Sequence, residues 1–475
     1  MRKREYLYKH LAAQLAEKIK NGVYQHGEKL PSIQQLHRRL NLSVSTIYKA
    51  FIELEYEGLV EARPKSGFYA QQPHEVESIL SDKPIKAFSA QRDASKFAHE
   101  IRLAIKNPSL VPFGQAMVSP SLLPYRQLVK ILKSTTASNI RSMVSYGKLQ
   151  GIYALRRQLS LRTVGLGYHV NPDEIVITNG CMEAISVSLM ALTQPGDTIA
   201  VESPTYFGYL PIFKQLGLSV VEIPTECSTG PDLDFLEAAI ASHKISVCLL
   251  IPNFHNPTGH LVSDSRKERL VKLLNEYDIP VIEDDVYSEL FYSGKKPTSL
   301  KIYDKRRLVI TCSSFSKTLA PGFRIGWIMA EGEVLEAIKR SKFAVSMATS
   351  NLDQNILSEY LSGNVYDRHL RSLRTILKKQ VQSVAIGIEK HFPPGTTFNL
   401  PKGGFILWVR LPEGSSGMAL YRKAILHRIS ILPGVLCSYS GTYKEYIRVG
   451  CGYPFDKKIG DAIATLGRLA HSLLK

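Results

Sequence analysis

The sequence predicts an α/β protein that begins with a small domain of three helices and a β-hairpin. Two observations support this fold class. Helical periodicity and turn signals fill the first 72 residues, and short apolar strands alternate with helical stretches beyond residue 110. The chain of 475 residues is long enough for two or three domains, and 44% hydrophobic residues allow large cores. We expect an N-terminal domain over residues 1–72, a linker over 73–107 and a large domain over 108–475.

The N-terminal domain begins with an amphipathic helix. Its apolar residues recur at helical spacing: Tyr8, Leu11, Leu15 and Ile19. The pair Asn21-Gly22 ends this helix. A second, shorter helix follows Pro31, because Ser32 and Gln35 form the capping-box pattern.

A third helix begins after Ser43, whose hydroxyl is placed to cap it. Its apolar residues are Ile47, Ala50, Phe51 and Leu54. Gly58 ends the helix, and the segments 59–63 and 68–71 then flank the turn 64–67, which predicts two strands joined by a turn. Three helices followed by a hairpin make a winged helix-turn-helix.

DNA binding by such a domain requires polar and basic residues at the start of the third helix. That helix opens here with Ser43, Val44, Ser45 and Thr46 and continues with Tyr48 and Lys49. Residues 1–72 hold 12 Lys and Arg against 7 Asp and Glu, and the whole chain has a net charge of +18. This balance favours a polyanionic partner and predicts salt-sensitive affinity. A small helical packing domain with solvated charges is the alternative.

The first domain resembles the DNA-binding domain of the GntR family over nearly all of residues 5–71. The motifs behind the resemblance are Gly27-Glu28-Lys29-Leu30-Pro31-Ser32, Leu42-Ser43-Val44-Ser45-Thr46-Ile47, Glu57-Gly58-Leu59-Val60 and Lys65-Ser66-Gly67. Gln34 and Val44 stand where the family has arginines, which predicts altered sequence preference or lower affinity. The resemblance implies double-stranded DNA as a partner, contacted by Gln34, Arg38, Arg39, Ser43, Ser45, Thr46, Tyr48, Lys49, Lys65, Ser66 and Gly67.

Residues 73–107 predict a linker, because they contain Pro73 and Pro84 and scattered charges without firm periodicity. Within this stretch, residues 97–105 are expected to form a helix that packs on the large domain.

The large domain alternates strands and helices, which predicts a mainly parallel sheet with its ligand site beyond the carboxyl ends of the strands. The predicted strands are 174–178, 198–201, 247–251, 280–283 and 308–312, and the predicted helices are 181–192, 206–216 and 264–277. The loop 178–182 places backbone amides at a helix N-terminus. Unpaired N–H groups and the helix dipole favour a phosphate there.

Three further motifs follow predicted strands: His255-Asn256-Pro257-Thr258-Gly259, Glu283-Asp284-Asp285-Val286-Tyr287, and Ser313-Ser314-Phe315-Ser316-Lys317 with Pro321-Gly322-Phe323-Arg324. A lysine among hydroxyls and an arginine is either a covalent amine nucleophile or a solvated charge. In this order the motifs resemble the fold type I pyridoxal-phosphate enzymes, the aspartate aminotransferase superfamily, over residues 110–470. The resemblance implies helices flanking the sheet, a small C-terminal α/β subdomain, and pyridoxal 5′-phosphate as the cofactor.

The same resemblance implies a role for each site residue. Lys317 forms the Schiff base with the cofactor aldehyde, and Asp284 pairs with the pyridinium nitrogen. Asn256 and Tyr287 hydrogen-bond the phenolic oxygen of the ring, and Tyr206 stacks on it. The phosphate is held by Gly180, Cys181, Met182, Ser314, Ser316 and Arg324.

Tyr146 resembles the tyrosine that reaches the phosphate of the neighbouring subunit, so a homodimer is expected. Arg448 occupies the place of the arginine that grips a substrate carboxylate. Positions in the hydrophobic core are the alternative for Tyr146 and Tyr206. Asp285 is expected to be structural, and no metal site is expected.

A GntR-like winged helix ahead of an aminotransferase-like domain is similar to the MocR subfamily of bacterial transcription regulators. This similarity implies a head-to-tail homodimer that binds DNA and uses pyridoxal phosphate, alone or with a small amino compound, as its effector. Physiological turnover is not expected beyond a residual aminotransferase half-reaction. The competing hypothesis is an active aminotransferase with a vestigial DNA-binding domain.

Composition also bears on the compartment. The basic start of the chain is not followed by the apolar stretch of a signal peptide, and no apolar run approaches the ~20 residues of a membrane-spanning helix. The six cysteines never form a C-x-x-C pair and are too sparse for a disulfide scaffold. We expect a cytoplasmic protein without a membrane partner.

Overall fold

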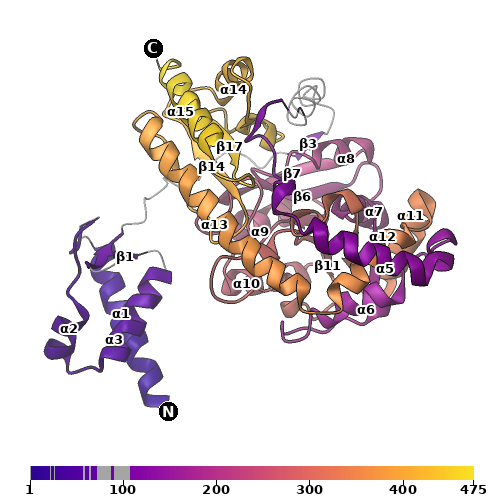
Figure 1. Cartoon of the computed structure of the whole chain (residues 1–475), viewed down its shortest axis with the longest axis horizontal. Helices are drawn as coiled ribbons and strands as arrows, with labels where there is room; N and C mark the ends of the chain where they lie inside the picture. The colour runs from indigo at the N-terminus through magenta and orange to yellow at the C-terminus, as the bar shows by residue number, and fades with distance from the viewer. Residues whose placement is uncertain are drawn as a thin grey trace. The chain divides into compact units, whose positions relative to one another are not determined.

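The structure is a computed structural model that describes residues 2–21, 23–25, 27–56, 59–63, 66–71, 87–89, 107 and 109–474. The chain divides into two units, residues 1–81 and 82–475 (Figure 1). The helix predicted over residues 97–105 lies outside the described residues.

The N-terminal unit has three helices and a two-stranded antiparallel hairpin, as predicted. These elements are α1 (Arg2–Lys20), α2 (Ile33–Leu40), α3 (Val44–Tyr56), β1 (Val60–Arg63) and β2 (Gly67–Ala70). Ser32 and Gln35 form the expected capping box at the start of α2. Asn41 ends α2 in the left-handed conformation, with φ of 50°, and so turns the chain toward α3. Gly22, Gly58 and the turn residues Pro64 and Lys65 lie outside the described residues.

The predicted apolar positions form the core of this unit. Ile19 of α1 and Ile47, Ala50, Phe51 and Leu54 of α3 are completely buried. The ring of Phe51 also stacks on Phe68 of β2, with 4.3 Å between the ring centroids. This contact fixes the hairpin against α3.

The C-terminal unit is built on one large sheet with the strand order β3-β7-β6-β9-β10-β11-β12-β5, and β8 pairs with β7 outside this order. The strands are β3 (Ala87–Ser89), β5 (Ile175–Thr178), β6 (Thr198–Ser203), β7 (Ser219–Glu226), β8 (Gly230–Pro231), β9 (Ile245–Leu250), β10 (Val281–Asp284), β11 (Val309–Ser314) and β12 (Gly326–Met329). The central strands from β7 to β11 pair in parallel, whereas β3, β12 and β5 pair antiparallel to their neighbours. The prediction of a mainly parallel sheet is confirmed.

Helices alternate with these strands along the chain, as expected for an α/β fold. They are α5 (Tyr125–Val144), α6 (Tyr153–Leu161), α7 (Cys181–Leu192), α8 (Leu210–Gln215), α9 (Leu233–Ser242), α10 (Asp264–Glu276), α11 (Gly332–Ser346), α12 (Asn351–Leu361) and α13 (Val365–His391). The prediction of a helix over 206–216 is wrong at its start. Pro211 is tolerated only in the first turn of a helix, so α8 begins at Leu210.

The prediction of a linker over residues 73–107 is wrong for residues 87–89, which form β3. This strand pairs antiparallel with β7, with Phe88 opposite Val220. An edge strand of three residues is too short for an alternating pattern to be recognised in the sequence. The strands β7 and β12 were also not predicted.

A second, smaller sheet follows α13, with the strand order β13-β14-β17-β16, and confirms the C-terminal subdomain. Its elements are β13 (Thr397–Phe398), β14 (Ile406–Arg410), β16 (Leu432–Pro433) and β17 (Tyr446–Gly450), accompanied by α14 (Gly417–Leu426) and α15 (Lys457–His471). The short strand β15 (Ile429–Ser430) pairs instead with β4 (Val111–Pro112).

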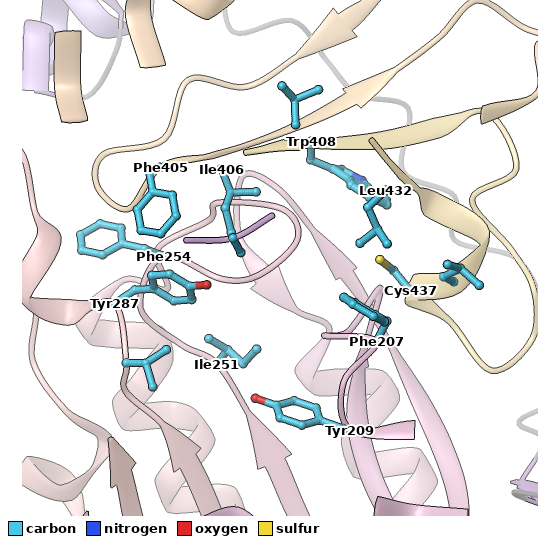
Figure 2. Packing of buried hydrophobic residues seen from close by; sticks show 14 of the residues in the cluster. Phe207, Tyr209, Ile251, Phe254, Tyr287, Phe405, Ile406, Trp408, Leu432 and Cys437 are labelled. Atoms are coloured by element: carbon cyan, nitrogen blue, oxygen red, sulfur yellow. The ribbon is translucent and has the colours of Figure 1, made fainter. Parts of the chain in front are cut away.

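One hydrophobic cluster joins the small sheet to the large one. Figure 2 shows Tyr287 and Phe254 facing Phe405 and Ile406, and the rings of Tyr287 and Phe405 meet edge to face at 5.8 Å. The loops at the carboxyl ends of the large sheet are therefore held against the small sheet. None of the helices in the described part of the chain is long and apolar enough to cross a membrane.

Candidate functional site

A cavity of about 180 Å³ lies at the carboxyl ends of the central strands. Its lining residues are Cys181, Met182, Tyr206, Ile251, Asn256, Asp284, Val286, Tyr287, Ser314, Ser316, Lys317 and Arg324. All of them except Ile251 and Val286 are predicted site residues. The fold thus brings together motifs that are more than 140 positions apart in the sequence.

One end of the cavity is suited to an anion. Gly180, with φ of 84°, precedes the first turn of α7, and a Cβ atom there would lie 2.3 Å from Nη2 of Arg324. Only glycine lets the guanidinium come this close to the helix N-terminus. Nη1 of Arg324 donates to Oγ of Ser316 at 3.1 Å. The guanidinium, a hydroxyl and the unpaired amides of α7 together match the chemistry of a phosphate group.

Lys317 ends a short 3₁₀ helix, Phe315–Lys317, that follows β11. Its Nζ donates to the carbonyl of Ala116 at 2.7 Å. Burial and the Arg448 guanidinium lower the pKa of Lys317 to about 8, against the opposing effect of Asp284. The lysine is therefore not the solvated charge of the alternative interpretation. An amine with a lowered pKa is a better nucleophile at neutral pH.

Asp284 is the last residue of β10, and its carboxylate is buried in the cavity wall. It accepts hydrogen bonds from the hydroxyl of Tyr209, from the amide of Val286 at 3.2 Å and from the thiol of Cys181 at 3.6 Å. Burial raises the pKa of Asp284, and these three donors oppose the rise. The carboxylate suits a buried cationic partner, such as a protonated ring nitrogen.

Asp285 faces away from this cavity. It accepts from Nδ2 of Asn253 at 2.9 Å and from Oγ of Ser288 at 2.6 Å. These contacts agree with the expectation that Asp285 has a structural part.

Asn256 connects the cavity to Arg448 of β17. Its Nδ2 donates to the hydroxyl of Tyr287 at 3.3 Å, and its Oδ1 accepts from Nη1 of Arg448 at 3.0 Å. Nη2 of Arg448 donates to the carbonyl of Gly114 at 2.6 Å. Arg448 is only 1% exposed, and its Nε has no hydrogen-bond partner among the described residues. Arg448 thus lies behind Asn256 rather than in the cavity wall, with one donor still free.

The two predicted aromatic residues differ in their environment. Tyr206 lines the cavity and packs edge to face against Tyr209 at 5.1 Å. Tyr146 is 92% exposed and does not line the cavity. A core position is therefore excluded for Tyr146.

Sequence reasoning missed three groups of this site: the hydroxyl of Tyr209 and the carbonyls of Gly114 and Ala116. Tyr209 lies three residues after Tyr206, a spacing that places both rings in one turn of chain. The two carbonyls belong to a segment without a motif, and no sequence signal indicates them.

Among the described residues of the N-terminal unit, the predicted DNA-contacting residues are exposed with two exceptions, Thr46 and Gly67. Gln34, Arg38, Arg39, Ser43, Ser45, Tyr48, Lys49 and Ser66 are exposed, and Gly67 is half-buried in the hairpin. Thr46 is 8% exposed, and its hydroxyl lies 2.7 Å from Oγ of Ser43. Lys65 lies outside the described residues.

The chain combines a winged helix-turn-helix with an α/β unit whose cavity holds Lys317, Asp284 and an anion site. This combination defines the class of aminotransferase-like proteins with an N-terminal DNA-binding fold. The family model "Bacterial regulatory proteins, gntR family" matches residues 7–70, and the model "Aminotransferase class I and II" matches residues 121–459. The chain therefore belongs to the aminotransferase class I and II family, among its members with a gntR-type N-terminal domain, the MocR architecture.

Some similar proteins match nearly the whole chain, and others match most of it. The uncharacterized HTH-type transcriptional regulator YjiR of Escherichia coli (strain K12) is 33% identical over 477 residues, covering 98% of this chain and 99% of YjiR. The regulator YdcR of the same strain is 34% identical over 473 residues, with the same coverage. The solved structure of the alpha-aminoadipate aminotransferase LysN from Thermus thermophilus, complexed with N-(5′-phosphopyridoxyl)-L-leucine, has a TM-score of 0.74 and 26% identity and covers 79% of this chain and 95% of LysN.

Proposed function

We propose that this protein is a transcription regulator that binds DNA through its N-terminal unit and senses pyridoxal phosphate, alone or with an amino compound, through its C-terminal unit. The observation that supports this most is the joining, in one chain, of a winged helix-turn-helix to a cavity that holds a lysine with a lowered pKa, a buried carboxylate and an anion site. The regulators YjiR and YdcR match the whole chain, which supports the same function.

The residues of the cavity fit pyridoxal phosphate. When bound, this cofactor supplies an electrophilic carbonyl and an aromatic electron sink. The close approach of Arg324 to Gly180 builds the phosphate site, which Cys181, Met182, Ser314 and Ser316 complete. The other residues of the cavity would take the remaining roles: Asp284 would pair with the protonated ring nitrogen, Asn256 and Tyr287 would hydrogen-bond the ring oxygen, Tyr206 would pack against the ring and Lys317 would supply the amine.

Arg448 is the group that recognises an effector carboxylate in this proposal. Its buried Nε has no partner among the described residues, and its Nη1 is held by Asn256, a residue of the cavity wall. A carboxylate near the cavity would pair with this free donor. Amino compounds with a carboxyl group are therefore the expected effector class.

A signal leaves the cavity through the segment 110–119 in this proposal. Lys317 and Arg448 donate to the carbonyls of Ala116 and Gly114 in that segment. Both side chains exchange these bonds for others when the cofactor and a carboxylate bind. A ligand shifts a conformational equilibrium only through such differences in contacts between two states. In the sequence, this segment lies between β3 and α5 of the C-terminal unit.

A homodimer belongs to the proposal, arranged head to tail as the resemblance implies. Tyr146, which is 92% exposed, follows α5, a helix with further exposed apolar residues: Tyr125, Val129, Ile140 and Val144. Such a surface is suited to a second copy of the chain.

The proposed function also implies a compartment. A regulator that binds the bacterial chromosome acts in the cytoplasm, so a cytoplasmic location belongs to the proposal.

An active aminotransferase is the second candidate function, because Lys317 and Asp284 line the cavity and Arg448 donates to Asn256 in its wall. Sustained transfer from an amino acid to a 2-oxo acid, at rates of about 1 to 1,000 per second, would favour this candidate. A half-reaction alone would not.

The experiment that tests the proposed function is fluorescence anisotropy of the purified protein on the DNA upstream of its own and neighbouring genes, with a scrambled duplex as the control. We expect specific binding that changes with pyridoxal phosphate. The Lys317→Ala variant should lose the covalently held cofactor and the response to effector but keep basal DNA binding. Equal, weak and salt-sensitive binding to both duplexes would favour the aminotransferase instead.

A further inference from the structure

We propose that α3 recognises the 5-methyl group of thymine in the major groove through an exposed apolar strip formed by Val44 and Tyr48. The inference rests on the proposed DNA-binding function and goes one step further, because it names the base that Val44 contacts. Each half-site of the operator then contains a thymine whose methyl group packs against Val44.

The strip is placed on the outward face of α3. Val44 is the first residue of this helix and Tyr48 follows one turn later, so both side chains lie on one face. Each is 51% exposed, whereas Ile47 and Phe51 of the same helix are completely buried. The residues at the N-terminal end of a recognition helix are those that reach base edges.

The polar side chains at the same end of α3 are already hydrogen-bonded to one another. Oγ of Ser43 lies 3.0 Å from Oγ of Ser45 and 2.7 Å from the hydroxyl of Thr46, and it also accepts from the amide of Thr46 at 3.2 Å. These bonds cap the helix. A hydroxyl that is already paired gains little from a base edge, so the apolar side chain of Val44 becomes the main reader at this position.

The charges around the strip match DNA rather than an apolar protein surface. Lys49 adjoins Tyr48 and is exposed, and the last turn of α2 presents His37, Arg38 and Arg39. Nδ1 of His37 also lies 2.6 Å from the carbonyl of Leu42, a contact that fixes the turn between the two helices. A partner for this face must be polyanionic and yet offer apolar groups. In the major groove of DNA, the thymine methyl group is the apolar group that a side chain meets.

The test begins with the full-length protein, loaded with pyridoxal phosphate, and a library of random duplexes from which it selects binding sites. Each thymine of the selected site is then replaced singly by deoxyuridine, which removes only the methyl group. One dT→dU replacement in each half-site should weaken binding about fourfold, the effect of one buried methyl-sized group. The other replacements should change the affinity little.

Variants identify the side chain that meets the methyl group. In Val44→Ala the penalty for the sensitive dT→dU replacement should disappear, which is the coupling expected for two groups in contact. Ile52→Ala is the matched control, because Ile52 is 42% exposed on the same helix but lies two turns beyond Val44, and it should keep the full penalty. Lys49→Ala should weaken binding to the dT and dU duplexes equally and lower the salt dependence.

The outcomes separate the inference from the proposed function. If a site is selected but no dT→dU replacement weakens binding, or if the penalty persists in Val44→Ala, the inference is overturned while the DNA-binding function stands. If no sequence is selected, both are overturned. If the apolar strip of Val44 and Tyr48 binds another protein instead of DNA, no sequence should be selected.

Discussion

Lys317 and Ala116 are joined by a hydrogen bond of 2.7 Å from the side-chain amine to the backbone carbonyl. The bond ties the predicted cofactor-binding lysine to the segment 110–119, which also meets Arg448 through Gly114 and accepts the amide of Gly450 at Phe113. Whatever occupies the amine of Lys317 therefore changes how firmly this segment is held.

We expect the Lys317→Ala substitution to loosen residues 113–119, because the carbonyl of Ala116 loses its donor. Loss of a hydrogen bond to a charged group corresponds to about tenfold faster exchange of the neighbouring amides. Hydrogen–deuterium exchange measured by mass spectrometry checks this, and saturating the wild-type protein with pyridoxal phosphate should produce a change in the same peptides. Lys339→Ala is the control, since Lys339 pairs with Glu336 within α11, and exchange of the segment should not change. Identical exchange in both variants would contradict the coupling.

Covalent capture of pyridoxal phosphate should become faster as the pH rises toward 8 and then level off. Burial and Arg448 lower the pKa of Lys317 to about 8, so about a tenth of the amine is free at pH 7, against less than about a thousandth for an ordinary lysine. Stopped-flow absorbance of the cofactor, recorded from pH 6 to 9, measures this rate. A rate that still rises tenfold between pH 8 and pH 9 would contradict the lowered pKa.

The order of the motifs made most of the cavity predictable from the sequence. Asn256, Asp284, Ser314 and Lys317 lie at or after the ends of strands that apolar runs reveal. Parallel strands bring their carboxyl ends to one edge of the sheet. The capping residues and the helical periodicity made the N-terminal unit equally accessible. Local patterns determine these features.

The features of the fold and the site that could not be predicted depend on tertiary contacts, which no local sequence pattern encodes. β3 has three residues, and β12 pairs antiparallel with β11 only through the tertiary fold. The carbonyl of Ala116 reaches Lys317 across 201 positions of chain. Thr46 is polar and stands near the start of α3, as expected of a DNA-contacting residue, but its hydroxyl pairs with Oγ of Ser43. Whether such a side chain bonds within the helix cap or points to solvent depends on packing, which the sequence pattern does not show.

Tyr209→Phe should weaken retention of the cofactor about tenfold. The hydroxyl of Tyr209 donates to Asp284 and lowers the pKa of that buried carboxyl, so its removal makes the ionised form less stable and the pairing with a ring nitrogen weaker. Equilibrium dialysis of pyridoxal phosphate measures the affinity. The control is Tyr292→Phe, which removes a similar hydrogen bond to the carbonyl of Gly404 outside the cavity. Equal losses in both variants would mean that Tyr209 only supports the core.

Acidification should destabilise the C-terminal unit through His260. Burial and His255 lower the pKa of His260 to about 4, although Glu202, 3.3 Å from its Nε2, opposes this. The unfolded chain takes up the proton near pH 6.5 and the folded chain only near pH 4, so the unfolded state binds more protons between these values and stability falls as the pH drops through this window. The free energy of unfolding from urea titrations should be about 2 kcal/mol lower at pH 5 than at pH 7. His260→Gln should flatten this dependence. His427→Gln, which replaces an exposed imidazole, should keep the wild-type slope, and a slope unchanged in both variants would assign the acid sensitivity to other groups.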